Sequence, residues 1–452
     1  MKRLSRREVL RGLLVAGLGA AGSSGLAACA GATPAPAGPA PGAETVEATS
    51  VGGAAEIQAT LEIWTYPRTE NDADMVYKPM MEKFVEEYPG ITPHIDVQPW
   101  GARREKLYAA AAAGEPPDIW FATTDTVPAY IEKDVILPLS DLLTPEDIAD
   151  YTEAEIAAAS FEGKLYMPLT DAEVNGFGYN GALLAELGYD PETTVIETWD
   201  DVYALAEKAK AKNWYVEHLS TMDWAEWLCT IHEAGGTVFS EDGTRSTIAE
   251  QPGVDALTRW VTEYQNGWVP LEYAVGNVEA SEGLPDYWLS LEQVTARRED
   301  AACWRDTNSN PELQYVIGHP RRMNKDHDLI SGLVSGQGWA ITKASKNQEA
   351  ALIWVKWMIR PENIGWYCSL AGTTPVGNKA KEAWQADPCV LEHVARFSPY
   401  LFSDRDTVTL WQESKVICAP HFQAAVLGQA TVEEALAACE AELNQTLREK
   451  MG

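Results

Sequence analysis

The sequence predicts an α/β protein whose body forms two lobes. Strand and helix signals alternate from about residue 58 onward, which is typical of sheets covered by helices and favours largely parallel strands. The body of about 395 residues is also longer than a single hydrophobic core usually supports. Two lobes of ordinary domain size are therefore expected.

Residues 1–28 are predicted to be a signal peptide and not part of the fold. A basic start precedes an apolar stretch over residues 10–28, which is broken by glycines and lacks the roughly 20 strongly apolar residues of a membrane-spanning helix. Arg6 and Arg7 resemble a twin-arginine motif. Residues 26–29, Leu-Ala-Ala-Cys, resemble a bacterial lipobox, so Cys29 is the expected lipid-bearing first residue of an exported chain. The alternative is an ordinary secretory signal followed by a chance cysteine.

Residues 29–57 are predicted to be a flexible linker. Ala, Gly, Pro, Thr and Ser dominate this stretch, and they provide no apolar bulk to offset the entropy of ordering the chain. With a lipid on Cys29, the linker holds the body near the outer face of the cell membrane, which makes the protein extracellular or periplasmic.

The body is strongly acidic. The whole chain carries a net charge of −32, and removal of residues 1–28, with five basic residues and one acidic residue, leaves −36. Nucleic acids and anionic lipid surfaces are excluded as partners, because binding to them depends on basic patches that neutralise phosphates. The charge is compatible with high solubility or with a saline or acidic habitat.

Three short strands open the body, over residues 60–66, 94–98 and 118–123. In the first, Leu61 and Ile63 share one face and Glu62 lies between them, which is the alternation of a half-buried strand. Two later helices have clear start signals. The first covers residues 198–211 and begins with the capping pair Thr198 and Asp201. The second covers residues 345–361 and ends at Pro361; its expected capping pair and buried stripe are Ser345, Gln348, Ala350, Ile353, Trp354 and Trp357.

The six cysteines of the body are Cys229, Cys303, Cys368, Cys389, Cys418 and Cys439. In an oxidising compartment they allow up to three disulfides among 15 connectivities, with free buried cysteines as the alternative. A bond between Cys418 and Cys439 would join two consecutive helical segments and close a loop of about 20 residues. We predict this pairing.

The sequence contains no recognisable catalytic motif. The histidine motif of zinc proteases, the serine elbow of hydrolases, the P-loop and the dinucleotide fingerprint are all missing, and residues 325–328 (Lys-Asp-His-Asp) are predicted to be a solvated loop. No enzyme activity, cofactor or metal ion is therefore expected. A carboxylate pair of a secreted glycoside hydrolase stays open as an alternative.

Tryptophan is unusually abundant, with 17 residues. Several lie in loops or at strand ends, where an indole ring can stack on the C–H face of a sugar; the chief candidates are Trp224, Trp227, Trp304 and Trp339. In contrast, Trp260, Trp354 and Trp357 have helical spacing and are predicted to lie in the core.

Four stretches resemble the extracellular solute-binding proteins of the maltose-binding type, the receptors of ABC importers. They are residues 84–100 with Tyr-Pro-Gly-Ile before a strand, 106–143 with Pro-Pro-Asp before a strand, 162–210 with Gly-Lys-Leu-Tyr and Thr-Trp-Asp, and 331–380 with Ser-Lys-Asn before a helix. Their order along the chain is the family's order. The resemblance implies a type II periplasmic-binding fold, with interleaved lobes that close on a ligand around a hinge. By the same resemblance, lobe one covers residues 58–172 and 328–374, lobe two covers 173–327 and 375–452, and the chain crosses near 170–175, 320–328 and 373–377.

The resemblance also implies a set of ligand-binding residues. Tyr66, Thr124 and Asp125 follow strands at the edge where open α/β sheets bind ligands, and Ala122 stands where the family has a stacking tryptophan. Together with the tryptophans and the basic residues considered as ligand contacts, the full predicted set is Tyr66, Arg68, Thr124, Asp125, Glu173, Asp223, Trp224, Trp227, Trp304, Arg305, Gly336, Trp339 and Lys415.

The function implied is a monomeric lipoprotein that captures a sugar or oligosaccharide and delivers it to a membrane permease. Sugar hydroxyls would bond Asp125, Glu173 and Arg305. A glycerol phosphodiester or another polyol phosphate is the alternative ligand, held by Arg68, Arg305 and Lys415. A glycoside hydrolase and a receptor that presents its ligand to a sensor kinase are the alternative functions.

Overall fold

The computed structural model describes residues 57–67, 73–99, 103–217, 219–275, 299–300, 302–333, 335–402 and 410–451. Only the backbone is described for residues 275, 299, 300, 302, 305, 309, 411, 412 and 451. Cys29 and the predicted signal peptide lie outside these residues, as does Arg68. None of the described helices has the length and apolar content needed to cross a membrane.

Two large clusters of buried side chains form the interior of the described body. The first, here called the first core, takes its residues from 61–169 and 339–380. The second core takes them from 179–274 and 410–447, together with Leu333. The chain therefore passes between the cores after Leu169, after Leu333 and after Ala380. The predicted lobe limits stay a prediction, and the first core extends past the predicted limit of residue 374.

A six-stranded mixed sheet lies in the first core, in the order β13-β6-β12-β3-β1-β2. Strand β1 pairs in parallel with β2 and β3, whereas β12 is antiparallel to both β3 and β6, and β13 is antiparallel to β6. The three strands expected at the start of the body are confirmed. The expectation of a largely parallel sheet is wrong, because the three pairings among β3, β12, β6 and β13 are antiparallel. The bounds are β1 Ala59–Thr65, β2 Ile91–Val97, β3 Ile119–Thr123, β6 Leu169–Glu173, β12 Ser335–Ile341 and β13 Thr374–Pro375.

Helix α12 (Gln348–Met358) packs on β12 and β1. Trp354 and Trp357 are fully buried as predicted, and Ile353 is half-buried. The predicted capping pair is wrong: Ser345 Oγ donates to Asp118 Oδ1 at 2.6 Å, and Gln348 Nε2 donates to the carbonyl of Lys343 at 2.8 Å. The other helices of this part are the π-helical turn η1 Ala73–Tyr77, α2 Lys78–Glu87, α3 Arg103–Ala113, α4 Val127–Glu132, α5 Glu153–Ala158, α13 Pro361–Ala371 and α14 Asn378–Ala383.

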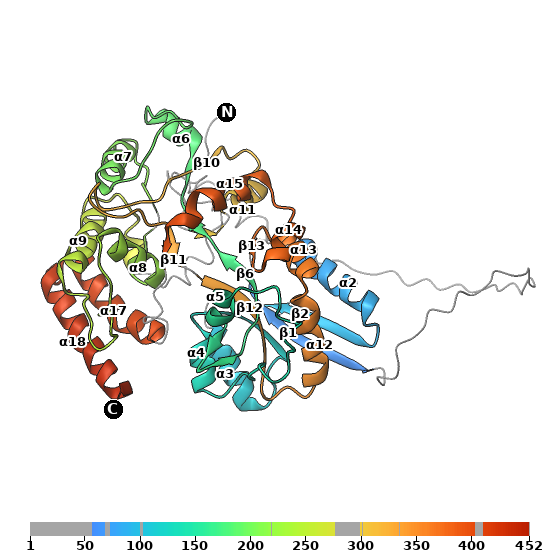
Figure 1. Ribbon diagram of the computed structural model, residues 1–452. Coiled ribbons are helices and arrows are strands. Elements are labelled where there is room, and N and C mark those ends of the chain that lie inside the picture. The colour runs from blue at the N-terminus through green and yellow to red at the C-terminus, as the bar shows by residue number, and fades with distance from the viewer. Residues whose placement is uncertain are drawn as a thin grey trace, which may run out of the picture. The chain divides into compact units, whose positions relative to one another are not determined.

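The second core is mainly helical. Helices α8 (Trp224–Glu233), α9 (Gln251–Gln265), α17 (Trp411–Val426) and α18 (Val432–Met451) lie side by side (Figure 1). Helix α7 (Trp199–Ala211) begins with the predicted capping box of Thr198 and Asp201. The remaining helices are α6 Gly181–Glu186, α10 Glu272–Val275, α11 Ala302–Ser309, α15 Pro388–Phe397 and the 3₁₀ turn η4 Ser398–Tyr400.

Four pairs of short strands complete the described strands. They are β4 Ser160–Phe161 with β5 Lys164–Leu165, β7 Asn175–Gly176 with β9 Glu299–Asp300, β8 Gly178–Asn180 with β10 Tyr315–Ile317, and β11 Gly332–Leu333 with β14 Leu401–Phe402. Of these, β11 and β14 run in parallel and the other three pairs are antiparallel.

Two disulfides join helices outside the six-stranded sheet. The predicted bond between Cys418 and Cys439 is confirmed and links α17 to α18, with 5.4 Å between the Cα atoms. A second bond links Cys303 of α11 to Cys389 of α15, with a Cα distance of 6.2 Å. The other two cysteines of the described body are buried and form no disulfide. The six cysteines therefore form two disulfides, which is neither the maximum of three nor the alternative in which all of them are free.

Candidate functional site

The candidate site lies where β1 and β3 end, next to the start of β12. Tyr66 directly follows β1 and is 1% exposed, while Thr124 and Asp125 directly follow β3. The backbone N–H of Thr124 donates to the carbonyl of Gly336 at 3.0 Å, and the N–H of Gly336 donates to Thr124 Oγ1 at 3.3 Å. These two bonds fix the loop after β3 against β12. Four predicted residues are thereby placed along one edge of the sheet.

Arg103, the first residue of α3, completes this group. Its guanidinium carbon lies 4.7 Å from the centre of the Tyr66 ring, within the range of a cation–π contact. Its Nη2 lies 3.3 Å from Thr123 Oγ1 and 4.0 Å from Asp125 Oδ2. Arg103 is not among the residues predicted from the sequence. Its signal was a pair of basic residues that opens a helix just after a strand in a very acidic chain.

The electrostatics of the group follow from burial and from the Arg103 charge. Burial by itself lowers the pKa of the Arg103 guanidinium, but the potentials of Tyr66, Asp125 and Glu173 outweigh it and raise that pKa. Burial raises the pKa of the Tyr66 phenol well above its ordinary value, against the opposing effect of Arg103. At neutral pH the Arg103 side chain is therefore a cation and the Tyr66 phenol is neutral.

Glu173, at the end of β6, is positioned by the neighbouring strand. It stands opposite Ser335 in the β6–β12 register, and Gln337 Nε2 donates to its Oε1. Because Gln337 is 2% exposed, its amide is a fixed donor that orients the carboxylate. Gln337 is also not among the predicted residues, since nothing in the sequence reveals which strand lies beside β6.

Two predicted residues lie at the start of α8, in the second core. Asp223 is the N-cap of this helix, and its Oδ1 accepts a hydrogen bond from the N–H of Glu226 at 3.1 Å. Trp224 is 4% exposed, and its indole Nε1–H is buried without a hydrogen-bond acceptor in the described part of the chain. Trp224 thus retains a donor, whereas one carboxylate oxygen of Asp223 already caps the helix.

Two predicted stacking residues are core residues instead. Trp227 is fully buried against Trp260 and Phe422, with ring centroids 5.3 and 4.2 Å away. Trp339 is fully buried against Phe121, at a centroid distance of 4.7 Å. A sugar cannot stack on either ring while these neighbours cover it. The burial of both side chains corrects the expectation that they contact a ligand.

The remaining predicted residues lie on other elements. Trp304 is half-buried on α11 and lies over Gly372, where a Cβ atom would come within 2.5 Å of the indole Cε3. Gly372 ends α13 with a φ of 67°, so both the backbone and the tryptophan require glycine there. Lys415 is half-buried on α17, and the backbone of Arg305 lies in α11.

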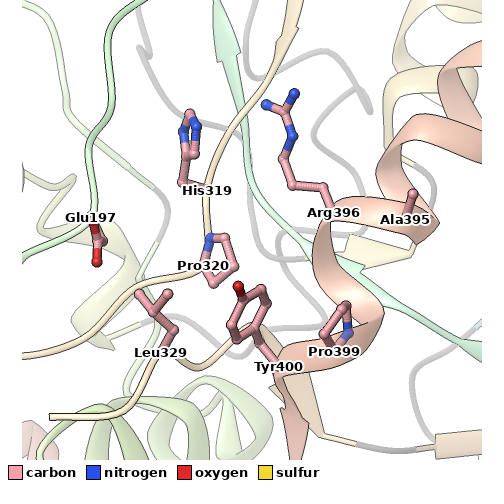
Figure 2. A pocket seen from close by; sticks show the side chains of 8 residues that line it. All are labelled: Glu197, His319, Pro320, Leu329, Ala395, Arg396, Pro399 and Tyr400. Atoms are coloured by element: carbon pink, nitrogen blue, oxygen red, sulfur yellow. The ribbon is translucent and has the colours of Figure 1, made fainter.

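A separate cavity of about 320 Å³ lies between the segment after β10 and the end of α15 (Figure 2). It is lined by Glu197, His319, Pro320, Leu329, Ala395, Arg396, Pro399 and Tyr400. Two charged side chains of the lining already have partners within the protein. Arg396 donates to the carbonyl of Ile317 at 2.7 Å, and Glu197 forms an ion pair with Arg322. None of the lining residues was predicted from the sequence to bind a ligand.

A metal centre has no support in the described residues, where no three His, Cys, Asp or Glu side chains are grouped to hold an ion. The site is therefore a group of aromatic, carboxylate and guanidinium side chains held at the edge of a sheet. Such a group can accept and donate several hydrogen bonds to one polyhydroxylated molecule.

Comparison with known proteins places the chain among binding proteins. The family described as bacterial extracellular solute-binding protein matches residues 70–364. One curated relative is the diacetylchitobiose binding protein DasA of Streptomyces coelicolor, which is 23% identical over 299 residues, or 65% of this chain and 67% of that protein.

Solved structures with the same fold include two sugar complexes. One is the ABC substrate-binding protein Lmo0181 of Listeria monocytogenes with cycloalternan, at 21% identity and a TM-score of 0.72, covering 86% of this chain and 99% of that one. The other is a solute-binding protein of Thermotoga lettingae with α-D-tagatose, at 18% identity and a TM-score of 0.75, covering 86% of this chain and 100% of that one. The predicted α/β periplasmic-binding fold is confirmed.

Proposed function

The chain belongs to the bacterial extracellular solute-binding proteins, and on that premise we propose that it captures a sugar or oligosaccharide and delivers it to the permease of an ABC importer. The observation that carries this proposal is the group of Tyr66, Arg103 and Asp125 at the carboxyl edge of the sheet, with Glu173 oriented by Gln337. Ligands of open α/β sheets bind at this edge.

The chemistry of this group fits a neutral sugar. Carboxylates accept hydrogen bonds from sugar hydroxyl groups, and the Arg103 guanidinium can donate hydrogen bonds to them. The Arg103 charge is compensated by the nearby Asp125, so the group has no surplus cation for a phosphate. The names of the relatives point the same way, because DasA is named for diacetylchitobiose and the two solved proteins hold cycloalternan and tagatose.

We expect Asp125→Asn to weaken binding of the best ligand about 10- to 100-fold, since a hydrogen bond to a charged group contributes about 1.5–3 kcal/mol. The ligand is first found by a thermal-shift screen of sugars, oligosaccharides, polyols and glycerol phosphates, because a ligand of the native state raises the melting temperature. Calorimetry then measures the affinity of both proteins.

The matched control for this prediction is Asp134→Asn. Asp134 lies on the exposed surface, pairs with Lys343, and has a positive φ of 56° that asparagine also tolerates. Equal affinity losses in the two variants would contradict a role of Asp125 in the site. Affinity at low and high salt separates the ligand classes, because screening weakens a phosphate contact and leaves a neutral sugar almost unaffected.

A lipid anchor on Cys29 completes the proposed function. Cys29→Ala is expected to be processed differently and to leave the membrane fraction, because it lacks the two or three acyl chains that would hold the protein there. Fractionation of cells that express each form, followed by immunoblotting, measures the distribution. A variant that stays in the membrane fraction to the same extent as the natural chain would refute the anchor.

A further inference from the structure

A buried ionic network lies inside the second core. Its centre is Arg259 of α9, whose guanidinium donates to three carboxylates from three parts of the chain. Nη2 lies 2.6 Å from Glu217 Oε1, Nη1 lies 2.8 Å from Glu233 Oε2, and Nε lies 2.9 Å from Glu263 Oε1. All four side chains are 5% exposed or less. Arg259 therefore ties α8, α9 and the segment around residue 217 together.

The second oxygen of Glu217 extends this network to Arg321. Arg321 Nη1 donates to Glu217 Oε2, and the Arg321 side chain is fully buried. The face of its guanidinium lies over the ring of Phe177, with 3.8 Å between the carbon and the ring centre. Arg321 thus contacts the network on one side and Phe177 on the other.

Phe177 belongs to the first passage between the cores, between Leu169 and Tyr179. The same passage contains Glu173 of the candidate site, four residues earlier. The backbone around Arg321 holds this passage in place, because the N–H of Gly318 donates to the carbonyl of Phe177 at 2.8 Å. Strands β8 and β10 pair directly beside this bond.

The segment of Arg321 is itself fixed to the second core. The N–H groups of Arg321 and Ile330 donate to each other's carbonyl oxygens at 2.9 and 2.7 Å. Two residues further along, the N–H of Met323 donates to the carbonyl of Glu233, a member of the network, at 2.9 Å. Any displacement of Phe177 relative to this segment therefore has to break the contact with Arg321.

We propose that Arg321 is a positioning residue for ligand binding, which locks the passage through Phe177 to the buried network and so sets where the second core stands relative to Glu173. This inference rests on the proposed function and on the expectation, implied by the family resemblance, that the two lobes close around the ligand. If the segment between Leu169 and Tyr179 is less firmly held, the two cores sample more relative orientations. The orientation that binds ligand is then less populated, and the observed affinity is weaker.

The test combines Arg321→Met with Glu217→Gln. The pair of changes removes one positive and one negative charge, so the rest of the network stays balanced, and the glutamine oxygen still accepts from Arg259. The matched control is Arg322→Met with Glu197→Gln, the same exchange one residue along at a pair that is 21% and 23% exposed. Amide hydrogen exchange over residues 175–180 and 318–323 is measured without ligand, and calorimetry measures the affinity for the best sugar of the screen.

We expect amide exchange in both segments to accelerate at least about tenfold, and the affinity to fall at least about fivefold, in the Arg321 double variant only. Faster exchange with unchanged affinity would reduce Arg321 to a purely structural residue and overturn the proposal. Unchanged amide exchange would show that Arg321 does not hold the segment around Phe177 in place, and it would also overturn the proposal. If the natural chain binds no sugar in the screen, the proposed function fails, and the exchange data still decide whether Arg321 locks the passage.

A conservative variant separates positioning from packing. Arg321→Lys keeps the positive charge and the pairing with Glu217, but it loses the planar face that covers Phe177. We expect affinity intermediate between the natural chain and the double variant. Affinity equal to that of the double variant would assign the effect to the planar contact, and affinity equal to that of the natural chain would refute a role of the contact with Phe177.

Discussion

Replacing Arg259 by methionine is expected to destabilise the folded protein by about 3–5 kcal/mol, because removal of one partner from a buried ion group leaves uncompensated charge in the core. In this variant the side chains of Glu217, Glu233 and Glu263 lose the guanidinium they share, and only Glu217 keeps an arginine partner, Arg321. Urea unfolding followed by circular dichroism measures the change in the free energy of unfolding.

The control for this prediction is Arg322→Met, which removes an arginine from a partly exposed pair with Glu197. The free energy of unfolding of this control is expected to fall by less than about 1 kcal/mol, the usual upper contribution of a partly exposed ion pair. If Arg259→Met costs no more than the control, the three carboxylates do not depend on Arg259 and the network is not a unit.

The second large effect concerns pH. Burial, together with the charge of Glu217, raises the pKa of Glu263 from 4.5 to about 8, so this carboxyl holds a proton at neutral pH. A group whose pKa is higher in the folded state stabilises the fold fully below its unfolded pKa, and this contribution disappears as the pH rises through the folded pKa. The contribution of Glu263 to the free energy of unfolding is therefore expected to decline as the pH rises from about 4.5 to about 8.

Glu217 has the opposite behaviour in a different pH range. The charges of Arg321 and Arg259 outweigh its burial and lower its pKa to about 2, so its contribution is lost only as the pH falls toward that value. Glu263→Gln keeps the neutral form at every pH and isolates the effect. Unfolding curves measured between about pH 4.5 and pH 8 should show a smaller loss of stability with rising pH in this variant, and identical losses in both proteins would contradict the raised pKa of Glu263.

Local sequence patterns predicted the elements that depend on neighbouring residues. The capping box at Thr198 and Asp201 and the buried stripe of α12 follow from spacing along one helix, and both are present. The mixed sheet was not predictable in this way. Strand β12 joins β3 and β6 from a distant part of the chain, and an apolar run does not reveal the direction of its partner.

The same distinction separates the parts of the candidate site. Tyr66, Thr124 and Asp125 were found because they follow strands, and this position is visible in the sequence. Arg103 and Gln337 were missed because their roles depend on which elements lie beside them. Trp227 and Trp339 were misjudged because a tryptophan near a loop and a tryptophan in a core have the same local pattern, and only packing distinguishes them.

The position of β12 at the centre of the sheet has a consequence for biosynthesis. Its partners β3 and β6 are made on the order of 200 residues earlier, and until β12 emerges each has an unpaired edge facing solvent. The N-terminal part of the sheet therefore cannot be completed while the middle of the chain is still being translated. A nascent or truncated chain that ends before residue 335 leaves β3 with one unpaired edge and β6 without either of its neighbours, and such edges are prone to aggregate unless a chaperone covers them.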